Sequence, residues 1–198
     1  MNWNDITLRQ YNDIVDIQKT SKNPANSLIE YFFDVHDAES SLPVGQYLAR
    51  LHELQFINSE RVPNKLQGTY TLNGRNYVLQ TNPPTLSAAQ YVDFEAYNRT
   101  KDTAGLLSVI MLPEKAKYYN AGYDIEQVKE DMLSMCILDV DAVNAFFLRL
   151  LQRYIKILAR CLSKLSRTKG VSKETAQAMT DVAAMAGECC RTCSPTAS

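Results

Sequence analysis

Three cysteines near the C-terminus are the residues of this chain best suited to hold a metal ion. Cys189, Cys190 and Cys193 are close together in sequence, and their thiolates could bind zinc or iron. A structural zinc site needs a fourth ligand, however, and the nearby sequence offers no further histidine or cysteine. An unstructured or intermolecular thiol cluster is therefore the preferred interpretation. The odd total of five cysteines likewise argues against a disulfide scaffold.

The two histidines of the chain give no clear catalytic pattern. His36 lies between Asp34 and Asp37, which could form a metal site, but no second cluster with ligand spacing accompanies it. We therefore expect a loop surface there. His52 falls between apolar positions of a predicted helix and is interpreted as a surface or boundary residue. Without a histidine paired to a cysteine, or a glycine-rich phosphate loop, we predict no catalytic residue, no metal, no cofactor and no enzymatic activity.

Charge is divided unevenly along the chain. Residues 1–141 hold 12 basic and 19 acidic side chains, whereas residues 142–198 hold 9 and 3. Six of the later basic residues follow one stripe of a predicted helix: Arg149, Arg153, Lys156, Arg160, Lys164 and Arg167. This basic stripe could be a solvated helix face, a surface for an acidic protein partner or a nucleic-acid site. The pI of about 6.1 weakens the third interpretation, so nucleic acid is not the expected partner.

Helical spacing dominates the first 60 residues. Thr7 and Gln10 form a predicted capping box, and Asn23-Pro24 and Leu42-Pro43 give two further helix starts. In the third helix the apolar positions recur at steps of three and four: Val44, Tyr47, Leu48, Leu51 and Leu54. Three short amphipathic helices of this kind predict a small bundle.

The period of the sequence changes between residues 68 and 80. Asn73-Gly74 is the preferred pair for a two-residue type I′ turn, because both central positions need positive φ. That turn places Leu72 opposite Arg75 in a β-hairpin. The apolar face of the hairpin then carries Tyr70, Leu72, Tyr77 and Leu79. Since an isolated hairpin is marginal in water, this face must rest on helices or on another strand.

Helices are predicted again after the hairpin. A capping box of Ser87 and Gln90 opens a helix with Tyr91, Phe94 and Tyr97 facing inward. The apolar segment 104–112 predicts a buried helix that Pro113 ends, and Asp124 is expected to cap the next one.

The longest predicted helix opens at Asp139 or Asp141 and runs to about Leu165. Its apolar residues alternate steps of four and three, which is typical of a coiled-coil seam. These residues are Val143, Phe147, Leu150, Tyr154, Ile157 and Cys161. We expect them to face either the core or a homo-oligomer interface.

The predicted fold class is mainly α, a helical bundle with one inserted β-hairpin at about residues 69–80. Three regions are expected: a small helical bundle at 3–60, a hairpin-containing helical domain at 66–167, and a weak helix with a disordered, cysteine-rich tail at 168–198. No apolar run reaches the roughly 18 residues needed to span a membrane. The N-terminus also lacks the features of a secretory signal, so we expect a cytoplasmic protein without membrane partners.

Several short pieces, taken in order, resemble one protein family over about residues 3–165. The pieces are Trp3-Asn4-Asp5-Ile6-Thr7-Leu8 with Gln10-Tyr11, Leu42-Pro43 with Leu54 and Phe56-Ile57, Leu72-Asn73-Gly74-Arg75-Asn76-Tyr77, Ala89-Gln90-Tyr91-Val92-Asp93-Phe94, Leu112-Pro113, Tyr119-Asn120-Ala121-Gly122-Tyr123-Asp124 and Phe146-Phe147-Leu148. They resemble the tail assembly chaperones and related tail-morphogenesis proteins of tailed phages, particularly phages of gut bacteria.

The resemblance implies a non-enzymatic protein that binds a phage structural protein, either the tape measure or a hub protein. It implies action in the host bacterial cytoplasm during virion morphogenesis and absence from the finished virion. It supplies no catalytic residue to carry over. The alternative is a permanent virion component in the tail, the neck or the interior.

Overall fold

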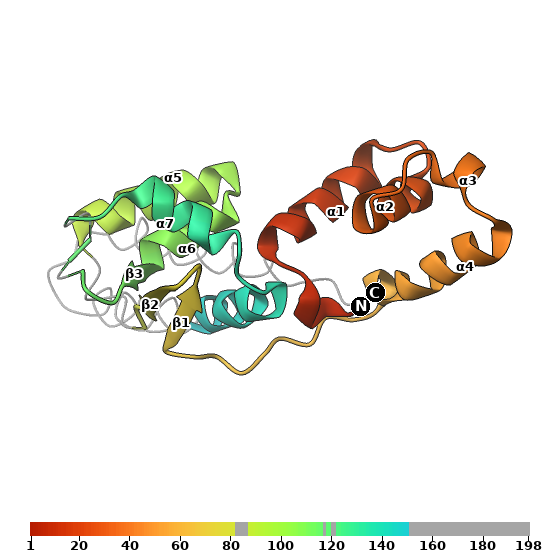
Figure 1. Ribbon diagram of the computed structural model, residues 1–198. Helices are drawn as coiled ribbons and strands as arrows, with labels where there is room; N and C mark the ends of the chain where they lie inside the picture. The colour runs from red at the N-terminus through yellow and green to blue at the C-terminus, as the bar shows by residue number, and fades with distance from the viewer. Residues whose placement is uncertain (82–86, 117, 120–121, 151–198) are drawn as a thin grey trace, which may run out of the picture. The chain divides into compact units, whose positions relative to one another are not determined.

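A computed structural model describes residues 1–81, 87–116, 118–119 and 122–150 of the chain (Figure 1). The fold is mainly α with one small antiparallel sheet, which confirms the predicted fold class. The chain divides into one compact unit, Met1–Ala142, and a second that begins at Val143. Residues 168–198, with the predicted disordered tail and its cysteines, lie outside the described residues, and the predicted division into three regions stays a prediction.

The first unit begins with a run of helices that start where the sequence indicates. After the 3-10 turn η1 (Trp3–Asp5) come α1 (Leu8–Thr20), α2 (Pro24–Phe33), α3 (Ala38–Ser41), α4 (Val44–Glu53) and the 3-10 turn η2 (Gln55–Asn58). The capping box of α1 is present, because the Thr7 hydroxyl accepts a hydrogen bond from the Gln10 amide while the Gln10 side chain accepts one from the Thr7 amide. The Asn23 side chain caps α2 by accepting from the Asn26 amide. The predicted helix starts are thus confirmed.

The hairpin forms as predicted. Strands β1 (Thr69–Leu72) and β2 (Arg75–Leu79) pair in antiparallel register with Leu72 opposite Arg75. Asn73 and Gly74 have φ of 48° and 75°, as a type I′ turn requires. The four residues of the predicted apolar face are all buried: Tyr70, Leu72, Tyr77 and Leu79.

A third strand completes the sheet and corrects one prediction. Helix α6 (Thr103–Ile110) ends before Met111, and β3 (Met111–Pro113) pairs antiparallel with β2. The predicted helix at 104–112 is therefore too long by two residues. Pro113 disfavours helical geometry at Leu112, and pairing with β2 satisfies backbone groups that the helix would otherwise have used.

Helix α5 (Ala88–Thr100) begins at the predicted capping box of Ser87 and Gln90. Of the three side chains predicted to face inward, Phe94 and Tyr97 are partly buried, whereas Tyr91 is not. Tyr91 is 60% exposed, whereas Gln90 is buried and donates a hydrogen bond of 3.0 Å from its Nε2 to the Val109 carbonyl. The capping residue thus also ties α5 to α6. Its apolar neighbour Tyr91 points outward instead.

The last described helices also start near the predicted positions. Asp124 caps α7 (Ile125–Met132) through its side chain, as expected. Residues 137–150 are helical, so this helix opens two residues before Asp139. Val143 is buried, while Phe147 and Leu150 are partly exposed. The other seam positions, Tyr154, Ile157 and Cys161, lie outside the described residues.

Backbone hydrogen bonds join the start of the first unit to the turn after α7. The Leu8 amide donates to the Met135 carbonyl at 2.8 Å, and the Ile137 amide donates to the Ile6 carbonyl at 2.9 Å. These two bonds bracket a short antiparallel bridge between Thr7 and Cys136. Residues near position 6 and residues near position 136 are thereby held together.

Candidate protein-binding surface

The structure places only one member of the predicted basic stripe. Arg149 lies exposed on the helix formed by residues 137–150. The remaining five positions, Arg153, Lys156, Arg160, Lys164 and Arg167, lie outside the described residues. The stripe as a partner-binding site therefore stays a prediction.

The loop around His36 connects α2 to α3. Asp34 and Asp37 both adopt a left-handed conformation, with φ of 51°. The backbone carbonyl of His36 accepts a hydrogen bond of 3.0 Å from the Ser41 hydroxyl. In the described part of the chain, no three His, Cys, Asp or Glu side chains are grouped so as to hold a metal ion.

Helix α4 exposes two large apolar residues. None of its residues is buried, although its sequence is amphipathic. Val44 is 75% exposed and Leu48, one turn further on, is 57% exposed. The sequence pattern predicts an apolar stripe here, but residues at both positions face solvent.

Two side-chain contacts made by α4 hold the helix against α2. The Tyr47 hydroxyl donates a hydrogen bond to the side-chain oxygen of Asn26. The Arg50 guanidinium lies 4.3 Å from the centre of the Phe33 ring, a cation–π contact. These contacts fix the helix through polar and aromatic groups, which leaves Val44 and Leu48 available to contact another molecule.

A hollow of about 220 Å³ adjoins the exposed end of α4. Glu39, Leu42, Val44 and Tyr47 line it. We call these four residues together with Leu48 the α3–α4 surface. One wall of the hollow is acidic: the Glu39 carboxylate accepts a hydrogen bond of 2.7 Å from Asn26 Nδ2 and lies next to apolar groups. This combination of apolar side chains and a carboxylate suits binding of an amphipathic segment.

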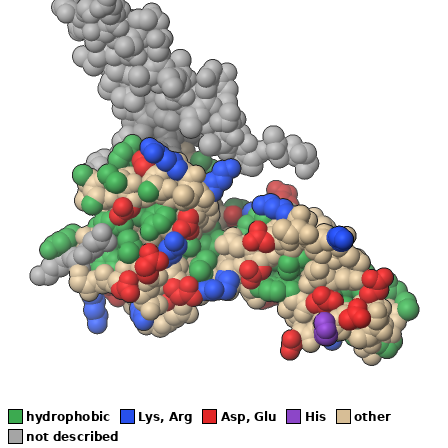
Figure 2. Space-filling model, turned by 90° about the horizontal axis from the view of Figure 1, so that it is seen from above, with side chains coloured by type: hydrophobic (Ala, Val, Ile, Leu, Met, Phe, Trp, Pro, Cys, Tyr) green, Lys and Arg blue, Asp and Glu red, His purple; other side chains and the backbone are tan. Residues whose placement is uncertain are grey.

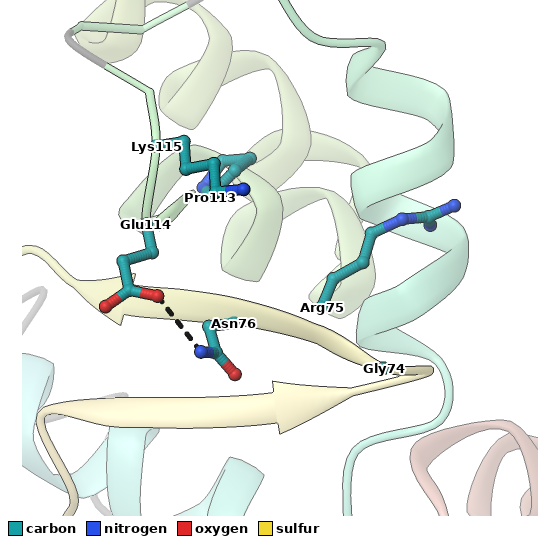
Figure 3. A pocket seen from close by; sticks show the side chains of 6 residues that line it. All are labelled: Gly74, Arg75, Asn76, Pro113, Glu114 and Lys115. Atoms are coloured by element: carbon teal, nitrogen blue, oxygen red, sulfur yellow. Dashed lines mark hydrogen bonds between the residues drawn. The ribbon is translucent and has the colours of Figure 1, made fainter.

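A second hollow lies at the tip of the hairpin (Figure 3). Its volume is about 330 Å³, and Gly74, Arg75, Asn76, Pro113, Glu114 and Lys115 line it. Asn76 Nδ2 donates to Glu114 at 3.0 Å, whereas the Arg75 side chain points away from both. Unlike the α3–α4 surface, this hollow is lined by no exposed large apolar side chain, so we prefer the α3–α4 surface as a protein-binding site.

The Arg75 side chain belongs instead to a polar cluster that surrounds Asp131 of α7. The Asp131 carboxylate is 1% exposed and accepts hydrogen bonds from Arg75 at 2.6 Å and from Asn73 at 2.9 Å. The hydroxyl of the buried Tyr77 and the amide of Gln127 also donate to it. This cluster joins the hairpin turn to α7.

Electrostatics in the cluster follow from these contacts. Burial by itself raises the pKa of Asp131, but hydrogen bonds from Tyr77, Asn73 and Arg75 outweigh that effect and hold the pKa below its usual value of 3.8. Burial and the Asp131 carboxylate raise the pKa of Tyr77 to about 12. At neutral pH the carboxylate is thus ionised and the phenol is protonated. Every group has a partner, which is typical of a structural cluster rather than a catalytic one.

No protein-family model, curated protein or solved structure matches this chain. None of the helices among the described residues is long and apolar enough to cross a membrane. The described residues form a mainly α fold in which Val44 and Leu48 of α4 are exposed.

Proposed function

We propose that this protein is a non-enzymatic assembly chaperone that binds a structural protein of a phage tail during morphogenesis. The tape-measure protein or a hub protein is the proposed partner, and the host bacterial cytoplasm is the proposed site of action. The observation that carries the proposal is the exposure of Val44 and Leu48 on a helix with no buried residue. The resemblance of residues 3–165 to tail assembly chaperones supplies the class of partner.

The physical argument starts from the cost of exposed apolar surface. Apolar side chains gain roughly 25 cal/mol for each Å² removed from water, so two large ones a turn apart favour contact with another molecule. Amphipathic helices commonly bind proteins through anchors at such spacing. A chaperone needs an apolar surface of this kind to shield its partner until assembly.

The basic stripe is proposed to assist the association. Charged residues at the rim of an interface mainly raise the association rate, and salt screens their effect. Reversing Arg153 and Arg160 to Glu should therefore slow binding at low salt while leaving the dissociation rate and the thermal unfolding midpoint nearly unchanged. Tight, salt-sensitive binding of DNA by the wild type in a mobility shift would instead assign the stripe to nucleic acid.

The proposal is tested by co-expressing the protein with each tail protein of the phage and isolating complexes. A complex with the tape-measure or a hub protein is expected, and failure with every tail protein would overturn the proposal. Mass spectrometry of purified virions separates a chaperone from a permanent component. A chaperone should be missing from virions, whereas a fixed copy number per particle would favour a structural protein of the tail, the neck or the interior.

A further inference from the structure

We infer that the α3–α4 surface binds a positively charged amphipathic helix of the partner protein. This inference rests on the proposed function, because it names the kind of segment that the assembly partner presents. Two features carry it: uncovered apolar side chains with helical spacing, and an excess of negative charge on the elements around them.

The apolar feature fits a helix. Val44 and Leu48 are four residues apart on α4, so their side chains lie on one face of the helix. Next to them, the hollow bounded by Leu42 and Tyr47 can receive one large apolar side chain. A partner helix with apolar residues a turn apart can place one residue in the hollow and another along Val44 and Leu48.

The charge of the surrounding elements indicates which charge the partner helix should carry. Residues 24–53, which include α2, α3 and α4, contain five Asp or Glu residues and one Lys or Arg residue. The acidic residues are Glu30, Asp34, Asp37, Glu39 and Glu53. Figure 2 shows Asp and Glu side chains at several places over the face in view.

Arg50, the one Lys or Arg residue of this segment, already has partners. Arg50 lies over the Phe33 ring and forms an ion pair of 3.2 Å with Glu53. The Glu39 carboxylate in the wall of the hollow accepts a hydrogen bond from the neutral Asn26 amide and forms no ion pair among the described residues, so its negative charge is available at the hollow. Lys and Arg residues that flank the apolar face of a partner helix match this charge, whereas Asp and Glu would be repelled.

The experiment uses the full-length protein and three synthetic helical peptides. The first peptide has leucines at steps of three and four and lysines on its other face. The second carries glutamate in place of every lysine, and the third carries serine in place of every leucine. Fluorescence anisotropy at low and high salt measures binding of each peptide.

Two variants test the two features separately. Val44→Ser with Leu48→Ser removes the apolar anchors at exposed positions. Asp34→Asn, Asp37→Asn and Glu39→Gln together remove three charges with little change of shape. Asn tolerates the left-handed conformation that Asp34 and Asp37 adopt, so the connection should keep its geometry.

Each variant has a matched control elsewhere in the first unit. Tyr91→Ser with Val92→Ser removes two comparably exposed apolar side chains from α5. Asp16→Asn, Glu60→Gln and Glu126→Gln remove three exposed acidic groups from other elements. The controls measure how much of the binding comes from net charge or from nonspecific hydrophobic contact.

We expect the leucine–lysine peptide to bind best and more weakly at high salt. The Val44 and Leu48 variant and the Asp34, Asp37 and Glu39 variant should each weaken that binding by about tenfold or more, while the controls stay within about twofold. Equal binding of the lysine and glutamate peptides would overturn the inference, as would equal losses in the controls. Self-association of the wild type that Val44→Ser with Leu48→Ser abolishes would also overturn it, because a second copy would then be the occupant.

Failure of this inference and failure of the proposed function give different results. If a tail protein still forms a complex with the variants of the α3–α4 surface, the chaperone function stands and the inference is wrong. If the leucine–lysine peptide binds as expected but no tail protein forms a complex, the surface is correctly assigned and the proposed function is wrong.

Discussion

At the scale of single residues, Asp131 shows how one buried charge can fix the relation between two elements. Its carboxylate accepts hydrogen bonds from Asn73 in the hairpin turn and from Arg75 and Tyr77 in β2. Gln127, one turn earlier on α7, adds a fourth donor at 3.2 Å. With donors on every side, the site requires a group that only accepts hydrogen bonds.

Asp131→Asn should therefore destabilise the protein although the two side chains have nearly the same shape. The Asn amide would place a donor against donors, so we expect a loss of about 2–3 kcal/mol in the free energy of unfolding at pH 7. Chemical denaturation measures this loss. Glu130→Gln, at an exposed ion pair with Arg9, is the control and should cost less than about 1 kcal/mol.

The same substitution should change how stability depends on pH. Because the fold lowers the pKa of Asp131 below 3.8, its ionised form stabilises the native state above that pH. This contribution is lost as the pH falls through the native pKa. Denaturation curves between about pH 5 and pH 2 should thus be less pH-dependent for Asp131→Asn than for the wild type, and identical slopes would contradict the assigned role.

Gly74 is required for its backbone conformation. With φ of 75°, it occupies the left-handed region that a β-branched residue resists. Gly74→Val should lower the free energy of unfolding by more than about 1 kcal/mol. Thr69→Val introduces the same side chain at an exposed strand position and should change stability little. An unchanged melting midpoint for Gly74→Val would rule out the type I′ turn.

At the scale of elements, α5 and α6 pack closely against each other at Gly105. A Cβ atom added to Gly105 of α6 would lie 2.3 Å from Cδ1 of Tyr97 on α5. Gly105 is therefore required by packing rather than by backbone conformation. A shift of the Tyr97 ring would also disturb its cation–π contact with Lys129, whose Nζ lies 5.1 Å from the centre of the ring.

Gly105→Ala should accordingly destabilise the protein by about 1–3 kcal/mol, even though alanine normally favours a helix by about 1 kcal/mol. Gly45→Ala in α4 is the matched control, since a Cβ atom added there would have no neighbouring atom within 4 Å. That substitution should leave the thermal midpoint unchanged or raise it. Equal responses of the two variants would contradict the close packing of α5 on α6.

The elements that the sequence predicts well are those that adjacent residues determine. The capping boxes at Thr7 and Ser87 and the Asn73-Gly74 turn each depend on two to four neighbouring residues. By contrast, the strand at Met111 depends on pairing with Leu79, far away in sequence. Local apolarity at residues 104–112 favours a helix and cannot reveal that pairing.

The binding surface illustrates a different limit of sequence reasoning. The spacing of Val44 and Leu48 correctly identifies an apolar stripe on α4, but spacing does not say what covers it. The same holds for Tyr91, whose place in a helical pattern wrongly predicts an inward side chain. Exposure depends on which elements pack nearby, so these residues emerge as a surface only in three dimensions.

At the scale of the whole molecule, an acidic segment and a basic segment of the chain have different roles in the proposed function. Residues 24–53 have a negative surplus beside the apolar face of α4, and residues 142–198 have a positive one. The first is proposed to select a basic helix of the partner, and the second to speed association. A single partner could engage both segments if it carried a basic helix for the α3–α4 surface and an acidic segment for the basic stripe.

The most direct test of the central claim is quantitative mass spectrometry of proteins that a tagged full-length chain retains from infected cells. The wild type and Tyr91→Ser with Val92→Ser should both retain a tape-measure or hub protein. The variant with Val44→Ser and Leu48→Ser should lose it while keeping its thermal midpoint. If no tail structural protein is enriched with the wild type, or if the α4 variant retains it fully, the role of this protein as a chaperone acting through α4 is contradicted.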